Sequence, residues 1–404
     1  MEKSIELVQI QPNPASTGAL IGGAIAAGHL LNDFMANILA PLLPFLSTHY
    51  GLSNTALGGI MAVFSASSAF TQPFFGMAVD HRRRGILLIW AAAWIGLAMS
   101  LLGIAGSLWA LITLAFFGGL GSGLYHPLGA TLMPKVVPAR QQGLWMSIFF
   151  VAGNVGFSLT PLLIVPLVEA GGLVTTLWLL APVLVVTLYM SLSGLGRVVD
   201  ENPRATSRLE SLAILRKNLG KVWVPVLAIN LIVFLRTWVM QGLNTFLPAF
   251  LVQLGYPVVT AGQMVSVYLF FGAIAGFVGG YLHDKIGARK VIAGSLLLGT
   301  LLLFGFYRTA GPWKWIFLAL AGAAVNCSLP VTVVVVQRLL PANAGLASGL
   351  MIGLVSACVS LFLPAIGAIA DAWGVNTALY CFLPLLPTAA LLTRLLPAHK
   401  PRQQ

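Results

Sequence analysis

The chain has 404 residues, of which 58% are hydrophobic and only 8% are charged. Soluble domains carry roughly 25% charged residues, so this composition excludes an ordinary soluble protein. The net charge of +12 would suit a nucleic-acid partner, but the placement of the basic residues, given below, indicates a membrane topology instead.

Apolar runs recur from end to end of the chain, and each is long enough to cross a hydrocarbon layer of roughly 30 Å. The alternating segments of ~10 residues that build a membrane β-barrel are absent from the sequence. Dividing the runs at Gly, Pro and charged residues predicts an all-α polytopic membrane protein. Its twelve transmembrane helices are expected at 17–46, 55–80, 85–107, 109–134, 140–168, 172–195, 222–252, 260–283, 289–309, 312–340, 344–371 and 375–397.

The one long polar stretch of the sequence, 196–221, lies between the sixth and seventh predicted helices. It predicts an N-terminal six-helix bundle over 1–195, a cytoplasmic linker over 196–221 and a C-terminal six-helix bundle over 222–404. If the N-terminus is cytoplasmic, 19 of the 22 Lys and Arg residues fall in cytoplasmic segments. Because cytoplasmic loops are enriched in these residues, both termini are predicted to be cytoplasmic, and no nucleic-acid partner is needed to explain the charge.

The two predicted bundles also resemble each other in sequence. An offset of 204 carries Pro44 onto Pro248, and an offset of 203 carries Pro127 onto Pro330. An offset that stays nearly constant over more than a hundred residues indicates an internal repeat. Two parallel six-helix repeats are typical of a secondary transporter with its site between the repeats near mid-membrane.

The loops after the second and eighth predicted helices share one pattern of glycine, aspartate and basic residues. Glycine allows close helix approach, and an aspartate at a helix end can pair with arginine or with a helix N-terminus. We expect a charge latch that favours one arrangement of the bundles; the alternative is that these loop charges are solvated and only set topology. The latch residues would be Gly76, Asp80, Arg82 and Arg83 in the first loop and Gly280, Asp284, Lys285, Gly287, Arg289 and Lys290 in the second.

Both loops resemble the signature of the major facilitator superfamily, Gly-x-x-x-Asp-Arg/Lys-x-Gly-Arg/Lys-Arg/Lys. The second copy matches it, and the first departs from it at His81 and Arg83. Three further stretches are similar to the fosmidomycin-resistance branch of that superfamily: GHLLNDFMANILAPLLPFLSTHYGLS (28–53), YHP (125–127) and SIFFVAGNVGFSLTPLL (147–163). The resemblance implies the major facilitator fold and a bacterial inner-membrane exporter of small toxic compounds, driven by proton influx.

The third stretch also partly resembles the antiporter signature of the family. It contains Gly153, Gly156 and Pro161 but lacks the direct Gly-Pro pair. The arginine that the family commonly carries in its fourth helix is absent as well. A helix rich in Gly and Pro is equally suited to be a hinge or a packing surface.

Four ionisable residues lie deep in predicted helices, namely His29, Asp33, His126 and Arg236. Such residues are costly in a membrane and usually face a cavity or a partner. His29, Asn32 and Asp33 follow helical spacing and form one polar stripe, with Asp33 about 24 Å along its helix. The predicted cavity set is completed by Asn154, Gln241 and Asn244.

The repeat offset places Arg236 at the position of Asn32 and Thr237 at that of Asp33. We therefore expect Asp33 to pair with Arg236 in one state, and to release it on protonation or when an anionic substrate takes the arginine. A permanent ion pair that holds the halves in register is the alternative.

His29 and His126 could assist proton transfer, because histidine titrates near physiological pH. With Asp33 they could also form a transition-metal site, although nothing in the sequence fixes the distance between the first and fourth helices. A purely structural role for His126 is a third reading. We predict no resident metal ion and no cofactor.

The sequence thus predicts a secondary active transporter that works by alternating access. HExxH, GxSxG and paired-Asp motifs are absent, which argues against an enzyme, and no ATP-binding Gly-x-x-x-x-Gly-Lys-Ser/Thr sequence is present. The first expectation is proton-coupled export of a small drug or metabolite, with an anionic group as an option, by a monomer in the bacterial inner membrane. Proton-coupled uptake of a small organic anion and transition-metal transport are the alternatives. The proton gradient, the small-molecule substrate and lipid are the expected energy source and partners.

Overall fold

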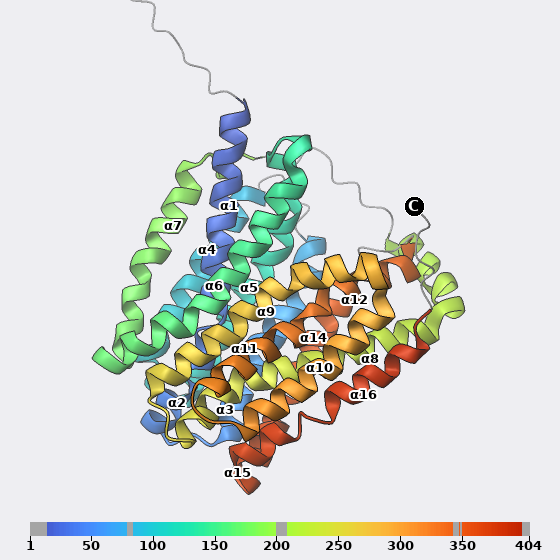
Figure 1. Cartoon of the computed structure of the whole chain (residues 1–404). Helices are drawn as coiled ribbons and strands as arrows, with labels where there is room; N and C mark the ends of the chain where they lie inside the picture. The colour runs from blue at the N-terminus through green and yellow to red at the C-terminus, as the bar shows by residue number, and fades with distance from the viewer. Residues whose placement is uncertain (1–13, 79–83, 199–207, 342–346, 348–349, 398–404) are drawn as a thin grey trace, which may run out of the picture.

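The computed structural model describes residues 14–78, 84–198, 208–341, 347 and 350–397. Throughout this described part the regular secondary structure is helical (Figure 1). In chain order the helices are α1 (Pro14–Ala36), α2 (Leu39–Tyr50), α3 (Asn54–Ala78), α4 (Arg84–Ser100), α5 (Leu108–Val136), α6 (Gln142–Gly171), α7 (Leu180–Leu192), α8 (Arg208–Gln253), α9 (Val258–Ile286), α10 (Ala288–Arg308), α11 (Pro312–Cys327), α12 (Leu329–Leu339), α14 (Val355–Leu361), α15 (Leu363–Tyr380) and α16 (Leu385–Leu392). Short connecting turns of 3₁₀ or π type lie at Leu101–Ile104, Ala139–Gln141, Leu173–Leu179, Leu195–Arg197, Leu350–Leu354 and Thr393–Leu395.

Ten of the segments in the described residues are long and apolar enough to cross a membrane. Together with α3 and the shorter α16 they correspond to the twelve predicted helices, so the predicted all-α polytopic fold is confirmed. The boundaries differ in two places. Residues 208–221 of the predicted linker are helical and join the seventh span in α8 across a non-helical Val222. The eleventh and twelfth predicted helices join in α15 across Gly374, whose φ is +86°.

The first predicted helix is two helices, and this corrects the single helix expected over 17–46. α1 ends at Ala36, and α2 begins at Leu39 after a short break. Pro41 explains the position of the break, because its ring has no N–H and collides with the carbonyl group of the residue four positions earlier, Asn37. The break follows directly after the polar stripe that carries Asp33.

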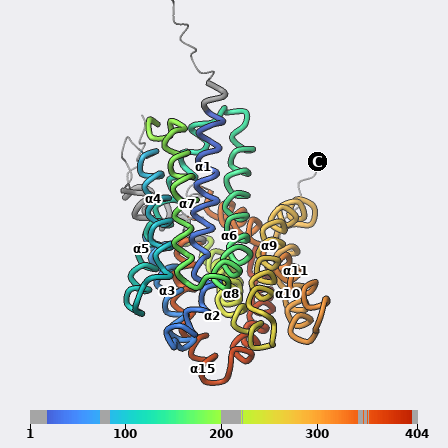
Figure 2. Tube along the Cα trace, turned by 90° about the vertical axis from the view of Figure 1, so that its left-hand side faces the viewer, coloured from blue at the N-terminus to red at the C-terminus, as the bar shows by residue number. Residues whose placement is uncertain are grey.

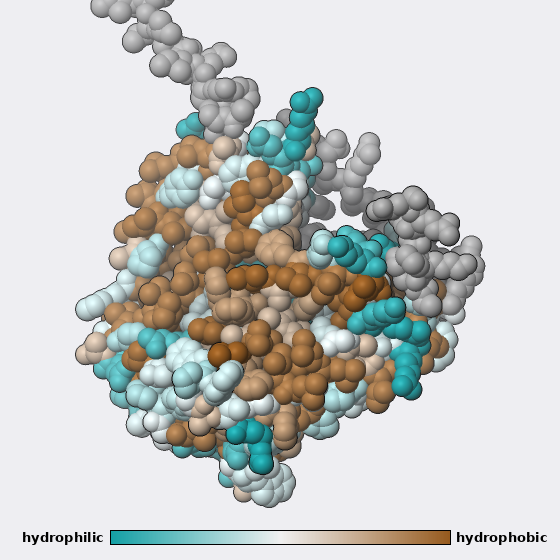
Figure 3. Space-filling model, in the orientation of Figure 1, coloured by the Kyte–Doolittle hydropathy of each residue, from teal (hydrophilic) through white to brown (hydrophobic). Residues whose placement is uncertain are grey.

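The apolar core is divided between the two halves of the chain. One cluster of buried hydrophobic residues runs from Ala228 to Leu396, whereas the other two lie between Ile21 and Leu195. Two residues cross this division: Leu363 of α15 is buried in an N-terminal cluster, and Phe157 of α6 packs against the C-terminal one. Large apolar side chains also cover the outside of the molecule, as with Trp109, which is 76% exposed. Figure 3 shows this apolar surface in brown.

The two halves meet through α3 with α15, α6 with α9, and α2 with α8. In both views the labels of α2, α3 and α15 lie near the same end of the molecule (Figures 1 and 2). Gly58 of α3 lies against the backbone of Leu363, and Gly262 of α9 lies against the carbonyl of Pro161. A cavity of about 400 Å³ lies between the halves at this end, lined by Phe45, Val168 and Val252 among others. We call this end, which bears the loops around residues 51–53 and 255–257, the closed end.

Glycines also set the distance between helices inside the N-terminal half. A Cβ atom at Gly156 of α6 would overlap the carbonyl oxygen of Leu30 on α1. Since backbone cannot move aside as a flexible side chain can, α6 and α1 can approach this closely only with glycine at this position.

We therefore predict that Gly156→Ala lowers the stability of the protein by about 1–3 kcal/mol, the usual cost of overpacking. The check is the thermal unfolding midpoint of the purified protein in detergent. Gly294→Ala is the matched control, because Gly294 is also helical and a Cβ there meets nothing within 4 Å. Equal midpoints for the two variants would show that the α1–α6 contact is not tight.

Candidate functional site

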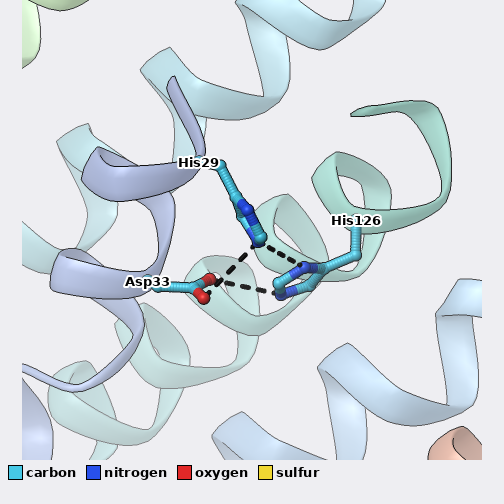
Figure 4. A group of neighbouring side chains, drawn as sticks. All are labelled: His29, Asp33 and His126. Atoms are coloured by element: carbon cyan, nitrogen blue, oxygen red, sulfur yellow. Dashed lines mark hydrogen bonds and ion pairs between the residues drawn. The ribbon is translucent and has the colours of Figure 1, made fainter. Parts of the chain in front are cut away.

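The polar stripe of α1 and the histidine of α5 form one cluster within the N-terminal half. His29 Nε2 lies 3.5 Å from Asp33 Oδ2 and 3.3 Å from His126 Nδ1. His126 Nε2 lies 3.5 Å from Asp33 Oδ1. Figure 4 shows the three side chains converging from two helices. We call His29, Asp33 and His126 the triad. The sequence predicted each member but could not predict that they meet.

The proton position on His29 follows from its surroundings. Its Nδ1 lies 2.7 Å from the carbonyl oxygen of Phe149 on α6. A carbonyl oxygen can only accept, so Nδ1 carries a hydrogen and donates it. The ring also stacks on Phe149, with centroids 3.8 Å apart. These contacts fix the ring so that, in neutral His29, the lone pair of Nε2 faces His126 and Asp33.

Asn32 orders the other side of the triad. Its Nδ2 donates to Asp33 Oδ1 at 2.9 Å and lies 3.4 Å from both Ser122 Oγ and His126 Nε2. Asn32 is fully buried, whereas the side chains of Asp33 and His126 are 17% and 33% exposed. Asn32 is therefore a positioning residue behind a carboxylate and an imidazole that water can reach.

The hydrogen-bond donors and acceptors of the triad do not determine whether one further proton is bound, or which atom carries it. With both rings neutral, His126 Nδ1–H donates to His29 Nε2, and the lone pair of His126 Nε2 then faces the carboxylate of Asp33. Two acceptors at 3.5 Å repel each other unless a proton is added to one of them. A proton on either His126 Nε2 or Asp33 removes the conflict, so the cluster can take up one proton and release it again.

The same atoms could also hold a transition-metal ion. The three ligand atoms that the triad offers lie within 4.8 Å of one another. Tetrahedral ligands at a Zn²⁺ ion, bound at roughly 2.0–2.1 Å, are about 3.3 Å apart. Phe149 would serve as the outer hydrogen-bond partner that metal-bound histidines usually have. Proton binding and metal binding therefore compete for the same lone pairs.

Helix α6 presents its glycine series to this cluster. A Cβ atom at Gly153 would lie 2.5 Å from Asp33 Oδ2 and 2.6 Å from His29 Cε1. Gly153 therefore leaves the space that the triad occupies. The glycines that resembled an antiporter signature pack α6 against α1: Gly153 faces the triad and Gly156 faces Leu30.

Arg236 is buried in the C-terminal half, and no carboxylate among the described residues forms an ion pair with it. Its guanidinium donates to Asn326 Oδ1 at 3.4 Å and Thr237 Oγ1 at 3.3 Å, and Nη1 lies 3.0 Å from Met240 Sδ. Its Nε finds no acceptor among the described residues, although the side chain is only 3% exposed. A buried cation with neutral partners alone is costly, and this arrangement suits an anion that is not part of the chain.

The expected pair of Asp33 and Arg236 is not formed in this structure. Each has partners in its own half: Asp33 lies beside α1 and α5 side chains, and Arg236 beside Asn326 of α11. The repeat places the two residues at related positions of two bundles, which fixes their depth but not their separation. The halves are joined near here by a different bond, in which Asn244 Nδ2 donates to Asn37 Oδ1 at 2.8 Å.

The remaining residues that were predicted to line the cavity lie outside the triad. Gln241 Oε1 accepts from Ser360 Oγ at 3.3 Å and so links α8 with α14. Asn154 is exposed on α6 and donates to the carbonyl of Phe150 in its own helix, and it stands outside the triad.

Only the second copy of the expected latch can be examined. Asp80, Arg82 and Arg83 lie outside the described residues, and Gly76 lies in α3. In the second copy Asp284 is exposed, and no ion pair joins it to a described residue. Three further members have clear places. Lys285 lies over the ring of Tyr281, Gly287 ends α9 with a φ of +83°, and Arg289 donates to the carbonyls of Thr393 and Arg394. Lys290 is exposed.

Arg289 therefore binds the carbonyl end of the last helical turn, where a cation is favoured, and the latch stays a prediction.

Several groups that contact the triad and Arg236 could not be identified from a single sequence. The carbonyl of Phe149, Ser122 and Asn326 contact the site only because distant helices pack together.

The fold and the two buried sites define a polytopic helical membrane protein with ionisable groups at mid-helix in both halves. The sequence matches the Major Facilitator Superfamily over residues 25–351 and again over 230–404. The chain belongs to this superfamily of transporters, and it is therefore a transporter and not an enzyme.

Among its relatives is the uncharacterized MFS-type transporter YfnC of Bacillus subtilis (strain 168), 31% identical over 386 residues that cover 92% of this chain and 91% of that protein. The fosmidomycin resistance protein of Escherichia coli (strain K12) is 28% identical over 393 residues, covering 96% and 95%. The predicted resemblance to that branch is thus confirmed. The multidrug resistance protein MdtG of Salmonella arizonae is 27% identical over 336 residues, covering 78% and 79%.

Solved structures share the fold at low sequence identity. A bacterial homolog of the human lysosomal transporter Spinster, in an inward-facing and unoccupied conformation, matches with a TM-score of 0.79 and 15% identity over 94% of this chain and 98% of that one. A D-xylose-proton symporter matches with a TM-score of 0.75 and 19% identity, over 96% and 99%.

The lack of a counter-ion leads to a prediction about Arg236. Arg236→Met should raise the stability of the substrate-free protein by about 1–3 kcal/mol, because an unpaired buried charge is removed and the volume is kept. Thermal unfolding in detergent measures it, with Arg308→Met as control for an exposed arginine. A lower midpoint for Arg236→Met than for the control would mean that Arg236 is a structural residue.

Proposed function

We propose that the protein is a secondary active transporter that exports a small drug or metabolite in exchange for protons by alternating access. It works as a monomer in the bacterial inner membrane, with both termini in the cytoplasm. The observation that carries the proposal is the triad, a partly exposed cluster with one undecided proton site beside the break between α1 and α2. Broken helices at mid-depth are where transporters of this kind bind substrates and coupling ions.

Proton coupling is supported by the way the triad is held. Phe149 and Asn32 fix the orientation of the imidazole and the carboxylate, so that adding a proton changes the charge of the site with little rearrangement. The positions of Asp33 and His126 within spanning helices support the same role, because an ionisable group there is costly unless it has a function. In this mechanism the triad takes a proton from the periplasm and releases it to the cytoplasm.

Arg236 is the candidate for the substrate side of the exchange. Its unsatisfied Nε and neutral neighbours suit a carboxylate or phosphate-like oxyanion, to which a guanidinium can offer two parallel hydrogen bonds. The substrate is then a small compound with an anionic group. The names of two relatives, a fosmidomycin resistance protein and a multidrug resistance protein, support export over uptake.

The arrangement of the halves fits one step of such a cycle. If the termini are cytoplasmic, the closed end faces the periplasm, and the structure corresponds to the inward-facing state. In this state the triad releases its proton and Arg236 receives substrate. Opening of the closed end then carries both sites to the other side of the membrane.

The role of Asp33 can be tested in proteoliposomes. We expect Asp33→Asn to reduce transport driven by a proton gradient to the level of empty vesicles, because the amide cannot take up the proton. Exchange of labelled for unlabelled substrate without a gradient should persist. Asp33→Glu keeps the carboxylate and should retain part of the coupled activity, and Glu169→Gln at an exposed site should retain all of it. Full gradient-driven transport by Asp33→Asn would refute the coupling role.

The cargo and its direction can be identified with the same vesicles. Organic anions that protect the protein from heat are the first to be tried, with Arg236→Gln expected to lose that protection. Right-side-out and everted vesicles distinguish export from uptake of an organic anion. Zn²⁺ accumulation that depends on His29 and His126 would replace the proton mechanism with metal transport.

A further inference from the structure

A carboxylate of the C-terminal half caps a helix of the N-terminal half at the closed end. Asp371 of α15 accepts four hydrogen bonds from the first two residues of α3. They come from the backbone N–H and side-chain amide of Asn54, at 2.8 and 2.9 Å, and from the backbone N–H and hydroxyl of Thr55, at 2.9 and 2.6 Å. Each carboxylate oxygen takes two of the four.

These bonds complete the first turn of α3. The first N–H groups of a helix have no acceptor within it. Ser53, just before α3, accepts from the N–H groups of Ala56 and Leu57 through its hydroxyl and its carbonyl. Within the described part of the chain, the two N–H groups that remain, those of Asn54 and Thr55, are satisfied only by Asp371. The positive end of α3 also favours a negative group at this place.

Glycines allow this close contact between α3 and α15, and one of them, Gly367, lies one helical turn before Asp371. A Cβ atom at Gly367 would overlap the backbone of Asn54, and one at Gly58 would overlap that of Leu363. The glycines let α3 and α15 touch backbone to backbone. Asp371 itself is exposed, so water can replace its partners when the helices separate.

We propose that Asp371 is a lock on the closed end, and that breaking its bonds to α3 is a required step when this end opens. The inference rests on the alternating-access function proposed above. Donors and acceptor belong to different halves, so the four bonds cannot persist once α3 and α15 move apart. The four bonds are short and charge-assisted, and they share one carboxylate. They therefore break together, which favours two discrete arrangements of α3 and α15, in contact or apart, over a continuous range of separations.

The lock predicts a shift in the populations of the two arrangements. Spin labels at Val174 and Leu254, two exposed positions near the closed end on opposite halves, report the separation by pulsed electron resonance. The labels require replacement of Cys327, Cys358 and Cys381 by Ala. Asp371→Asn should raise the ratio of the longer to the shorter distance by about tenfold, as expected when charged hydrogen bonds become neutral and fewer.

Two further variants make the test specific. Thr55→Val removes one donor and should raise the same ratio by a smaller factor, and combining it with Asp371→Asn should add less than the product of the single effects. Glu169→Gln removes an exposed carboxylate near the end of α6, at the same end, and should leave the distances unchanged. Unchanged distances in Asp371→Asn, or equal shifts in Glu169→Gln, would overturn the proposal.

The readout does not depend on transport. If Asp33→Asn kept full proton coupling while Asp371→Asn shifted the distances, the lock would stand and the coupling role would fall. If Asp371→Asn left the distances unchanged while Asp33→Asn abolished proton-driven transport, the coupling role would stand and the lock would be refuted.

Discussion

The structure is governed by the absence of water from the hydrocarbon layer, which forces every buried polar group to find a partner inside the protein. Most buried polar groups have a hydrogen-bond partner in their own helix or across a close helix contact. Tyr125, for example, donates to the carbonyl of Ile25 at 2.7 Å. The triad and Arg236 are among the places where this constraint is met incompletely; Tyr268 and Ser266, whose hydroxyl groups have no partner among the described residues, are others. In the triad the hydrogen-bond pattern leaves the position of one proton undetermined, and the guanidinium of Arg236 has no counter-ion among the described residues.

The same constraint explains why the break in the first span is tolerated. Pro41 interrupts the helix, and the side chain of Asn37 at the break is bound on both sides, donating to the carbonyl of Phe157 at 2.8 Å and accepting from Asn244. Asn37 therefore joins the two halves at the point where helical hydrogen bonding is weakest. This junction lies one helical turn beyond Asp33, whose carbonyl accepts from the backbone N–H of Asn37 at 3.1 Å.

The sequence was sufficient for the fold and for the members of the site, and insufficient for their contacts. Apolar runs located the helices, and helical spacing placed His29, Asn32 and Asp33 on one face, as observed. The approach of α1 to α6 and to α5 depends on glycines such as Gly153 and Gly28, where a Cβ atom would overlap Asp33 and the hydroxyl of Tyr125, and this fit is visible only when the helices are packed. The pair of Asp33 and Arg236 failed to appear because repeat symmetry relates positions in two bundles and leaves the distance between the bundles free.

The result is a division of chemistry between two halves that the repeat makes alike in architecture. The triad lies on α1 and α5 of the N-terminal half, and Arg236, which forms no ion pair with a described residue, lies on α8 of the C-terminal half. Neither site contacts the other in this structure, so a direct charge exchange cannot couple them here. Any coupling between them must then act through the contacts that join the halves, among them Asn37 with Asn244 at the break and Asp371 with α3 at the closed end. Because these contacts depend on how the bundles sit together, a change of charge at either site can influence the other by changing which arrangement of the bundles is favoured.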